Sequence, residues 1–303
     1  MKTIHIVEED LPNAYEKALL ACWNEGSNFP TEYDHEGDPN SRDVTAMIHI
    51  KDPFKEPRIH RAFPDGLSGL EKYRSEVLYG VHNHWCDPAA GKWEYTYHER
   101  LFEYKVPSVG VFNQIKTVIE KLKDVPYTRR AQAVTWQVWN DSTIDDPACL
   151  QRLWFRVERI KCDICNGAEI KVKNNMCSCR GIGYTDVLNM TGHQRSQDAY
   201  KAAFMNYYAY TELQKMVADE LGVDVGSAVF MIDSFHIYGS YFGEFEGFLK
   251  MVENREFEDR IYDTAYAIPM FIEGCDILLG EEDMPEDKKE LVRQRKAYLE
   301  SLF

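Results

Sequence analysis

The chain has 303 residues, of which 44% are hydrophobic and 28% are charged. This length allows one large or two medium-sized domains with a substantial buried core. The 50 acidic and 35 basic side chains give a formal charge of −15, which argues against general attraction to nucleic acid or to an anionic membrane. Residues 8–10 are acidic before an apolar signal core can form, and no apolar run approaches the roughly 20 residues of a spanning helix. We therefore expect a cytoplasmic protein that binds neither nucleic acid nor membrane.

The spacing of apolar residues predicts a mixture of helices and strands. In the first half these are a helix at 13–24 that stops at Gly26, a strand at 44–50, helices at 67–81 and about 111–122, and strands at 131–139 and 153–160. The second half continues with a long helix over 198–221, a strand over 227–236 and a charged helix over 287–303. Because β-α-β alternation is not regular, we expect an α+β fold, with a mixed sheet flanked by helices.

Cys149 follows a proline turn and leads into an apolar strand. Taken alone, such a cysteine is usually a small buried hydrophobe. Its surroundings are more informative, because four motifs flank it in order: Arg129-Arg130, Gln194-Arg195-Ser196-Gln197-Asp198 at the head of the long helix, Asn206 eight residues beyond Asp198, and His236-Ile237-Tyr238. Together with Pro-Ala-Cys, this order resembles the thymidylate synthase family over about residues 97–238. The residues within these motifs are more similar to those of the archaeal and phage branch than to those of the common bacterial enzyme.

The resemblance implies a thymidylate synthase-like fold and a folate-dependent transfer of a one-carbon unit to C5 of a pyrimidine nucleoside 5′-monophosphate. C5 is a poor nucleophile until a thiolate adds at C6, and Cys149 would be that thiolate. A free thiol has a pKa of about 8.5, so ionisation at neutral pH needs positive charge nearby, which Arg195 could supply. Glu76, Tyr97 and Asp198 match the other catalytic positions.

The resemblance also implies a phosphate site built from arginines, whose multidentate donors suit phosphate better than lysine does. Arg195 and Ser196 would come from one subunit and Arg129 and Arg130 from its partner, with Arg42 as a further ligand. This arrangement would make the protein a homodimer with shared active sites.

The nucleoside would be held by residues on either side of the nucleophile. Asn206 matches the position whose amide hydrogen-bonds to the pyrimidine edge. An amide donates to O4 and accepts from N3–H of uracil, whereas a carboxyl group would suit cytosine. His236 and Tyr238 would bind the 3′-hydroxyl of the sugar, and Gln194 would be a further substrate-binding residue. Deoxyuridylate is the expected substrate and 5,10-methylenetetrahydrofolate the expected co-substrate.

Two departures from the family pattern leave the product open. Leu150 stands where the family commonly has histidine, and residues 298–303 lack the small apolar C-terminus that closes over the folate. Closure keeps water away from the exocyclic-methylene intermediate until a hydride arrives. The alternatives are thus methylation, as in a thymidylate synthase, or hydroxymethylation of deoxyuridylate or a cytidylate. A non-catalytic nucleotide-binding or regulatory protein is the alternative from another class.

A cysteine-rich insert occupies residues 161–184 of what we expect to be a single catalytic domain over 1–303. Its cysteines are Cys162, Cys165, Cys177 and Cys179. Four thiolates from two turns suit a tetrahedral structural zinc site, although the second pair is Cys-x-Cys rather than the usual Cys-x-x-Cys. The family does not require this site. The alternative is a hairpin with four reduced thiols or an occasional disulfide.

Overall fold

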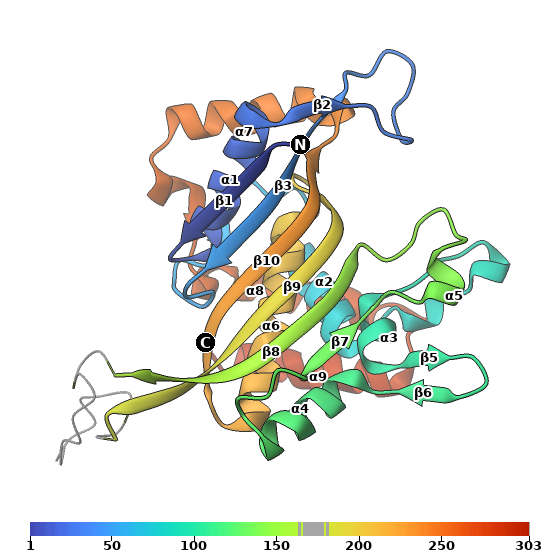
Figure 1. Cartoon of the computed structure of the whole chain (residues 1–303), viewed down its shortest axis with the longest axis vertical. Helices are drawn as coiled ribbons and strands as arrows, with labels where there is room; N and C mark the ends of the chain where they lie inside the picture. Colours follow the sequence, from blue (N-terminus) through green and yellow to red (C-terminus); the bar gives the residue numbers. More distant parts are fainter. Residues whose placement is uncertain (163–164, 166–178, 180–181, 303) are drawn as a thin grey trace.

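A computed structural model describes residues 1–162, 165, 179 and 182–302 of the chain. Its centre is a seven-stranded sheet with the order β1-β3-β10-β9-β8-β7, to which β2 adds beside β3 (Figure 1). The β1–β3 and β9–β10 pairs are parallel and the other pairs are antiparallel. The strands are β1 (Thr3–Glu8), β2 (Ser27–Phe29), β3 (Ser41–Ile50), β7 (Gln132–Val134), β8 (Leu150–Lys161), β9 (Tyr184–Asp198) and β10 (Asp224–Ile237).

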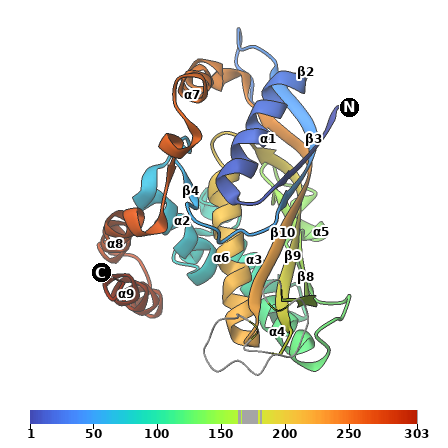
Figure 2. The ribbon, with the colours of Figure 1, turned by 90° about the vertical axis from the view of Figure 1, so that its left-hand side faces the viewer.

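The main helices lie on one face of this sheet, with α6 next to the strands and α8 and α9 farther out (Figure 2). The helices are α1 (Leu11–Glu25), α2 (Gly66–Tyr79), α3 (Tyr97–Phe102), α4 (Gln114–Asp124), α5 (Val138–Asp141), α6 (Ala203–Leu221), α7 (Phe242–Asn254), α8 (Thr264–Leu279) and α9 (Glu286–Glu300). Two small ladders pair β4 (Ile59–His60) with β11 (Ile261–Tyr262) and β5 (Tyr104–Val106) with β6 (Gly110–Phe112). Within the described residues, the helices all fall short of the length and apolarity that a membrane span requires.

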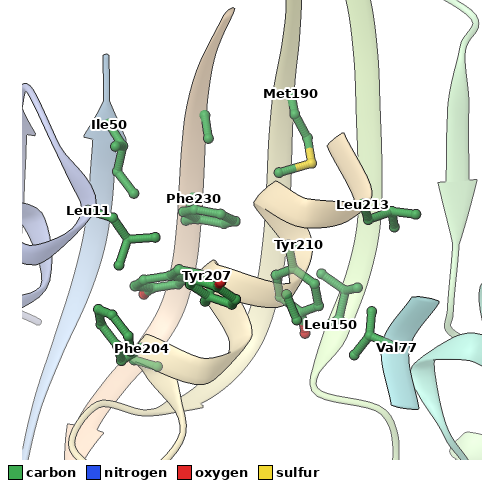
Figure 3. Packing of buried hydrophobic residues seen from close by; sticks show 14 of the residues in the cluster. Leu11, Ile50, Val77, Leu150, Met190, Phe204, Tyr207, Tyr210, Leu213 and Phe230 are labelled. Carbon is green, nitrogen blue, oxygen red and sulfur yellow. The ribbon is translucent and has the colours of Figure 1, made fainter. Parts of the chain in front are cut away.

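The core forms where α6 packs on the centre of the sheet (Figure 3). Tyr207 of α6 stacks on Phe230 of β10 with ring centroids 4.3 Å apart, and both side chains are fully buried. Gly192 on the neighbouring strand makes room for that ring, because a Cβ atom there would lie 2.9 Å from Phe230 Cδ1. Full burial of such a side chain contributes about 1.5–3 kcal/mol. This packing fixes the first turns of α6 against the middle of β9 and β10.

The predicted α+β class, with a mixed sheet flanked by helices, is confirmed. The strand predicted at 131–139 is wrong in its second half, because β7 ends at Val134 and α5 follows. The reason is a buried polar contact that the alternating pattern does not reveal. The Asp141 carboxylate accepts the backbone N–H of Gln137 at 2.7 Å and two bonds from the Arg100 guanidinium at 2.8 and 3.0 Å, and these bonds hold a short helical turn.

Two predicted helix starts also need correction. The helix expected from about 111 begins at Gln114, because the Asn113 side chain caps it by accepting the Lys116 N–H at 2.8 Å. The Gln-Arg-Ser-Gln-Asp motif lies on the last residues of β9 and not at the head of a helix. Asp198 ends that strand by accepting two backbone N–H groups, at 2.9 and 3.0 Å, a turn that competes with helix formation until α6 begins.

Candidate active site

A cavity of about 600 Å³ opens where β8 begins and β9 and β10 end, which we call the Cys149 cavity. The start of α6, one face of α2 and the segment 92–97 form the rest of its wall. Eight residues that the sequence predicted as functional line it together: Glu76, Tyr97, Cys149, Ser196, Asp198, Asn206, His236 and Tyr238. Side chains far apart in the sequence therefore meet around one space of a size typical for small-molecule sites.

The backbone holds Cys149 in place through three bonds. Its N–H donates to the Tyr95 hydroxyl at 3.4 Å, and the next N–H, of Leu150, donates to the Tyr97 hydroxyl at 3.3 Å. The Cys149 carbonyl accepts the Arg195 N–H at 2.9 Å. The β8–β9 register shifts between Leu150 and Arg152, and bulges of this kind redirect side chains next to active sites. The Leu150 side chain is fully buried in the core, so it does not replace the family's histidine at the cavity wall.

Burial dominates the electrostatics of the thiol. It raises the pKa of Cys149 above the ordinary value, and the charge of Asp146 adds to this effect, whereas Arg195 and a hydrogen bond from Tyr95 lower the pKa. The expected influence of Arg195 is thus present, but in this structure it is smaller than the effect of burial. Burial therefore favours the protonated thiol over the thiolate.

Arg195 lies behind the turn that carries Cys149. Its Nε–H donates to the Ala148 carbonyl at 3.2 Å and its Nη2 donates to the Pro147 carbonyl at 2.5 Å. The guanidinium thereby ties the end of β9 to the loop before the nucleophile. Ser196, the next residue, lines the cavity itself.

A chain of amides lies at the deep end of the cavity. Asn206 Nδ2 donates to Gln197 Oε1 at 3.1 Å, and Asn206 Oδ1 accepts the Tyr73 hydroxyl. Gln197 Nε2 donates to the Asp198 carbonyl at 3.0 Å, and Gln194 Nε2 donates to the same Gln197 oxygen. Because the backbone carbonyl fixes the Gln197 amide, Gln197 in turn fixes which end of the Asn206 amide is nitrogen.

The sequence analysis did not assign a role to Tyr73 or Gln197. The spacing of Tyr73, three residues before Glu76 on the same helix, places both on one helix face and is a signal that could have found it. Gln197 stands at the variable position of its motif, and only the fold shows that its side chain contacts Asn206.

His236 and Tyr238, at the end of β10, also line the cavity. Their ring centroids are 4.5 Å apart. His236 is 4% exposed, and its Nδ1 lies 3.2 Å from the Ser234 hydroxyl. Its Nε2 is buried without a hydrogen-bond partner among the described residues. A buried polar atom in this state is costly unless a ligand satisfies it, so the geometry suits a bound hydroxyl group.

Two carboxylates face the cavity from different elements. Burial raises the pKa of Asp198, although two backbone N–H groups and His236 oppose it. Glu76 of α2 lies 3.0 Å from His82 Nδ1, and His82 Nε2 lies 3.3 Å from Glu281 in the turn between α8 and α9. Burial disfavours the charged imidazolium, but these two glutamates outweigh it and raise the pKa of His82. The His82 imidazole thus bridges a cavity carboxylate and the C-terminal part of the chain.

Other predicted substrate ligands do not line the cavity in this single chain. Arg42 on β3 pairs in register with Ile237, and its Nη1 donates to the Gly26 carbonyl at 3.1 Å. Arg129 and Arg130 are exposed in the loop before β7. Gln194 is fully buried beneath the cavity and touches it only through Gln197. The roles predicted for these residues stay predictions.

The cysteine-rich insert lies at the far ends of β8 and β9. The thiols of Cys162, Cys165 and Cys179 lie within 4.8 Å of one another. Cys177 lies outside the described residues. The structure thus brings together the three members of the predicted zinc site that it describes.

The C-terminal residues turn away from the nucleophile. Leu302 and Tyr298 line a different cavity of about 700 Å³, together with Arg58 and Arg74. None of the described residues after α8 belongs to the wall of the Cys149 cavity.

Comparison with known proteins matches residues 70–261 to the family model "Thymidylate synthase". The chain belongs to the thymidylate synthase family. Proteins named "Putative thymidylate synthase" are similar to it: one from Methanococcoides burtonii is 28% identical over 243 residues, covering 80% of this chain and 93% of the relative. Another, from Methanocaldococcus jannaschii, is 26% identical over 240 residues, covering 77% and 90%. A third, from Methanothermobacter marburgensis, is 30% identical over 181 residues, covering 60% and 64%. The family transfers one-carbon units and binds nucleotide and folate.

Proposed function

We propose that this member of the thymidylate synthase family transfers a one-carbon unit from 5,10-methylenetetrahydrofolate to C5 of deoxyuridylate, forming thymidylate. The observation that carries the proposal is the shared cavity of Cys149, Asn206 and His236. A thiol, a side-chain amide and an imidazole whose Nε2 has no partner among the described residues line one space of about 600 Å³, which supports their roles as nucleophile, base ligand and sugar ligand. These three groups match the three parts of a nucleoside that the reaction must hold.

In this proposal Cys149 adds through sulfur to C6 of the pyrimidine, and electrons move toward O4 and make C5 nucleophilic. Asn206 stabilises the resulting enolate by donating from Nδ2 to O4, while its Oδ1 accepts from N3–H. The raised pKa of the free thiol means that addition needs a proton acceptor. Tyr95 and the charge of Arg195 are the groups that favour the thiolate.

Glu76 and Asp198 are the carboxyl groups available for proton transfer at the base. Glu76 is held by His82 on its outer side, so it can exchange a proton on its cavity side. Asp198 is fixed by backbone N–H groups, and its neighbour Gln197 orders the Asn206 amide. His236 and Tyr238 bind the 3′-hydroxyl, with Ser196 and Arg195 on the phosphate side.

The cavity also fits a folate ring system. Trp93, Tyr95 and Tyr97 line the wall that is not used by the proposed nucleotide ligands, and aromatic faces favour a flat heterocycle. The folate supplies the methylene carbon, and in a methyl transfer also the hydride.

We also propose a homodimer in which the partner supplies Arg129 and Arg130 to the phosphate, with Arg42 nearby. Arg129 and Arg130 are exposed, and neither they nor the half-buried Arg42 line the cavity of their own chain. The sheet face away from the helices exposes Met47 and Met231, which pair across β3 and β10, and apolar groups on an open sheet face favour association. We further propose that residues 1–303 form one catalytic domain, in which 161–184 is an insert. The protein would work in the cytoplasm, where reducing conditions keep Cys149 as a thiol.

One observation favours a second product. Leu302 lies in a separate cavity, so the described C-terminus does not cover the Cys149 cavity. If water reaches the exocyclic methylene before a hydride does, the product is 5-hydroxymethyldeoxyuridylate. This alternative uses the same nucleophile and the same base contacts.

Mass analysis of the nucleotide formed from deoxyuridylate and methylenetetrahydrofolate tests the proposal. Methyl and hydroxymethyl products differ by one oxygen, so the mass decides between the two reactions. Cys149→Ala is the matched control and should give neither product. If the wild-type enzyme forms no C5-substituted nucleotide from deoxyuridylate but does so from a cytidylate, the choice of base is wrong.

A further inference from the structure

We propose that the β8–β9 hairpin carries a structural zinc ion bound by Cys162, Cys165 and Cys179. The site has no part in the folate reaction and is not a requirement of the family. Its three thiols lie within 4.8 Å of one another, and the side chains are only 4–6% exposed. Among the described residues they form a buried cluster separate from the main core.

The sulfur positions fit tetrahedral thiolate coordination. Zinc–sulfur bonds of about 2.3 Å place two ligands of a tetrahedron about 3.8 Å apart. The Cys165 and Cys179 sulfurs are 3.4 Å apart, which is near that edge length and well beyond the roughly 2.05 Å of a disulfide bond. Two of the ligands come from Cys-x-x-Cys, a spacing typical of one half of a zinc site.

The backbone around the cluster also suits a thiolate ligand. The Gly183 N–H donates to Cys179 Sγ at 3.3 Å, and hydrogen bonds of this type stabilise negative charge on sulfur. Gly183 has φ of +88°, a left-handed conformation that glycine adopts readily. Its carbonyl accepts the Cys162 N–H at 3.0 Å, so the same residue joins the first and last described ligands.

Zinc is the metal that this donor set favours. Soft thiolates select zinc or iron–sulfur chemistry, whereas oxygen ligands would be needed for magnesium or calcium. The proposed ligands are the three described thiols; Cys177, which the sequence analysis predicted as a further ligand, lies outside the described residues. A fourth thiolate would close the coordination shell, as in structural rather than catalytic sites.

The position of the cluster indicates its role. β8 and β9 pair from Leu150 opposite Gln194 to Lys161 opposite Tyr184, and their far ends project beyond the helices (Figure 1). The twelve residues of β8 lie between Cys149 and Cys162, and at about 3.3 Å per residue these thirteen steps correspond to roughly 43 Å. A metal at that distance cannot contact the substrates. It would hold the two strands in register. The same two strands carry Cys149 and Arg195 together at the opposite end of the hairpin.

Metal analysis of the full-length protein, purified with reducing agent and without added zinc, tests the proposal. The expected result is about one zinc per chain, falling at least fivefold in Cys165→Ser and in Cys179→Ser. Cys86→Ser is the matched control, because Cys86 is a partly buried thiol that lies outside the cluster, and it should keep its zinc. The zinc-free variants should unfold at lower temperature, while kcat at 25 °C stays within about threefold of the wild type.

A second measurement covers the case in which the variants do not fold. Cobalt added to metal-stripped wild-type protein should give the visible absorption of a tetrahedral thiolate site, and one equivalent of zinc should abolish it. The proposal is overturned if the wild-type protein contains no zinc and cobalt produces no such absorption. It is also overturned if mass analysis of protein purified under reducing conditions shows a disulfide that joins two of the three cysteines.

Discussion

Replacing Asn206 by aspartate tests how this protein selects its pyrimidine. In the wild type the Asn206 Nδ2 donates to Gln197 Oε1 at 3.1 Å and Oδ1 accepts the Tyr73 hydroxyl. The amide then has one N–H for O4 and one lone pair for N3–H of uracil. An aspartate has the same shape but presents an acceptor where the N–H was. The substitution therefore changes hydrogen-bond polarity with little change in volume.

The size of the effect follows from the burial of the site, since Asn206 is 6% exposed. Loss of the bond to O4 costs about 0.5–1.5 kcal/mol, and two facing acceptors without a proton cost about 1–3 kcal/mol more. The sum of about 2–4 kcal/mol corresponds to a 30- to 1,000-fold lower kcat/KM for deoxyuridylate. Deoxycytidylate should gain, because a protonated carboxyl can donate to N3 and accept from the exocyclic amine. Burial and the facing Gln197 oxygen favour that protonated form, so the gain should disappear as the pH rises.

The assay is kcat/KM for both nucleotides over a pH series, in the wild type, Asn206→Asp and Asn206→Ala. The alanine variant should lose deoxyuridylate activity without gaining any with deoxycytidylate. If Asn206→Asp changes kcat/KM for the two nucleotides by the same factor, Asn206 does not select the base. A wild-type preference for deoxycytidylate would contradict the assignment before any variant is made.

Three other results are expected. Cys149→Ala should abolish turnover and leave nucleotide affinity within about tenfold, as measured by calorimetry; appreciable residual turnover would disprove its role as nucleophile. Mixing Cys149→Ala chains with inactive Arg130→Ala chains should restore part of the activity, because one site in each heterodimer has all its native groups; no recovery after verified exchange would place Arg130 in its own subunit's site or outside any site. The raised pKa of His82 means that its ion pairs stabilise the fold fully below about pH 6.5 and are lost as the pH rises through the folded-state pKa. The melting temperature of His82→Gln should thus fall below that of the wild type most at low pH, and a constant difference across the pH series would contradict this coupling.

Local patterns of apolar residues predicted the helices and strands that bury one face against the core. The helix α2 and the strand β10 were found because their apolar residues repeat with the correct period. Local patterns failed where a distant partner decides the conformation. Asp141 bends the chain into α5 because Arg100, 41 residues earlier, binds its carboxylate. The parallel pairing of β1 with β3 likewise depends on a crossover by α1 that no local signal specifies.

At the candidate site, too, local sequence patterns were informative only where no distant partner decides the conformation. Motif order predicted eight of the residues that line the Cys149 cavity but missed Tyr73 and Gln197, because a motif reveals residue type and order but not which side chains meet in the fold. The direction in which the pKa of Cys149 is shifted was not predictable, since burial of the thiol outweighs the charge of Arg195. The orientation of the Asn206 amide also required the fold, because Gln197 stands on β9 and only strand pairing and the start of α6 bring the two together.

In the proposed function, Arg195 serves both the loop of the nucleophile and the phosphate of the substrate. A guanidinium carries five N–H donors in a planar fork. In the described part of the chain, Nε–H and one Nη2–H hold the carbonyls of Ala148 and Pro147, which leaves three donors for a phosphate. A lysine has one ammonium group without this fixed geometry, so it could not brace the loop before Cys149 and bind a phosphate in the same orientation. Phosphate binding can therefore be linked to the placement of the thiol, because both depend on the position of a single planar group.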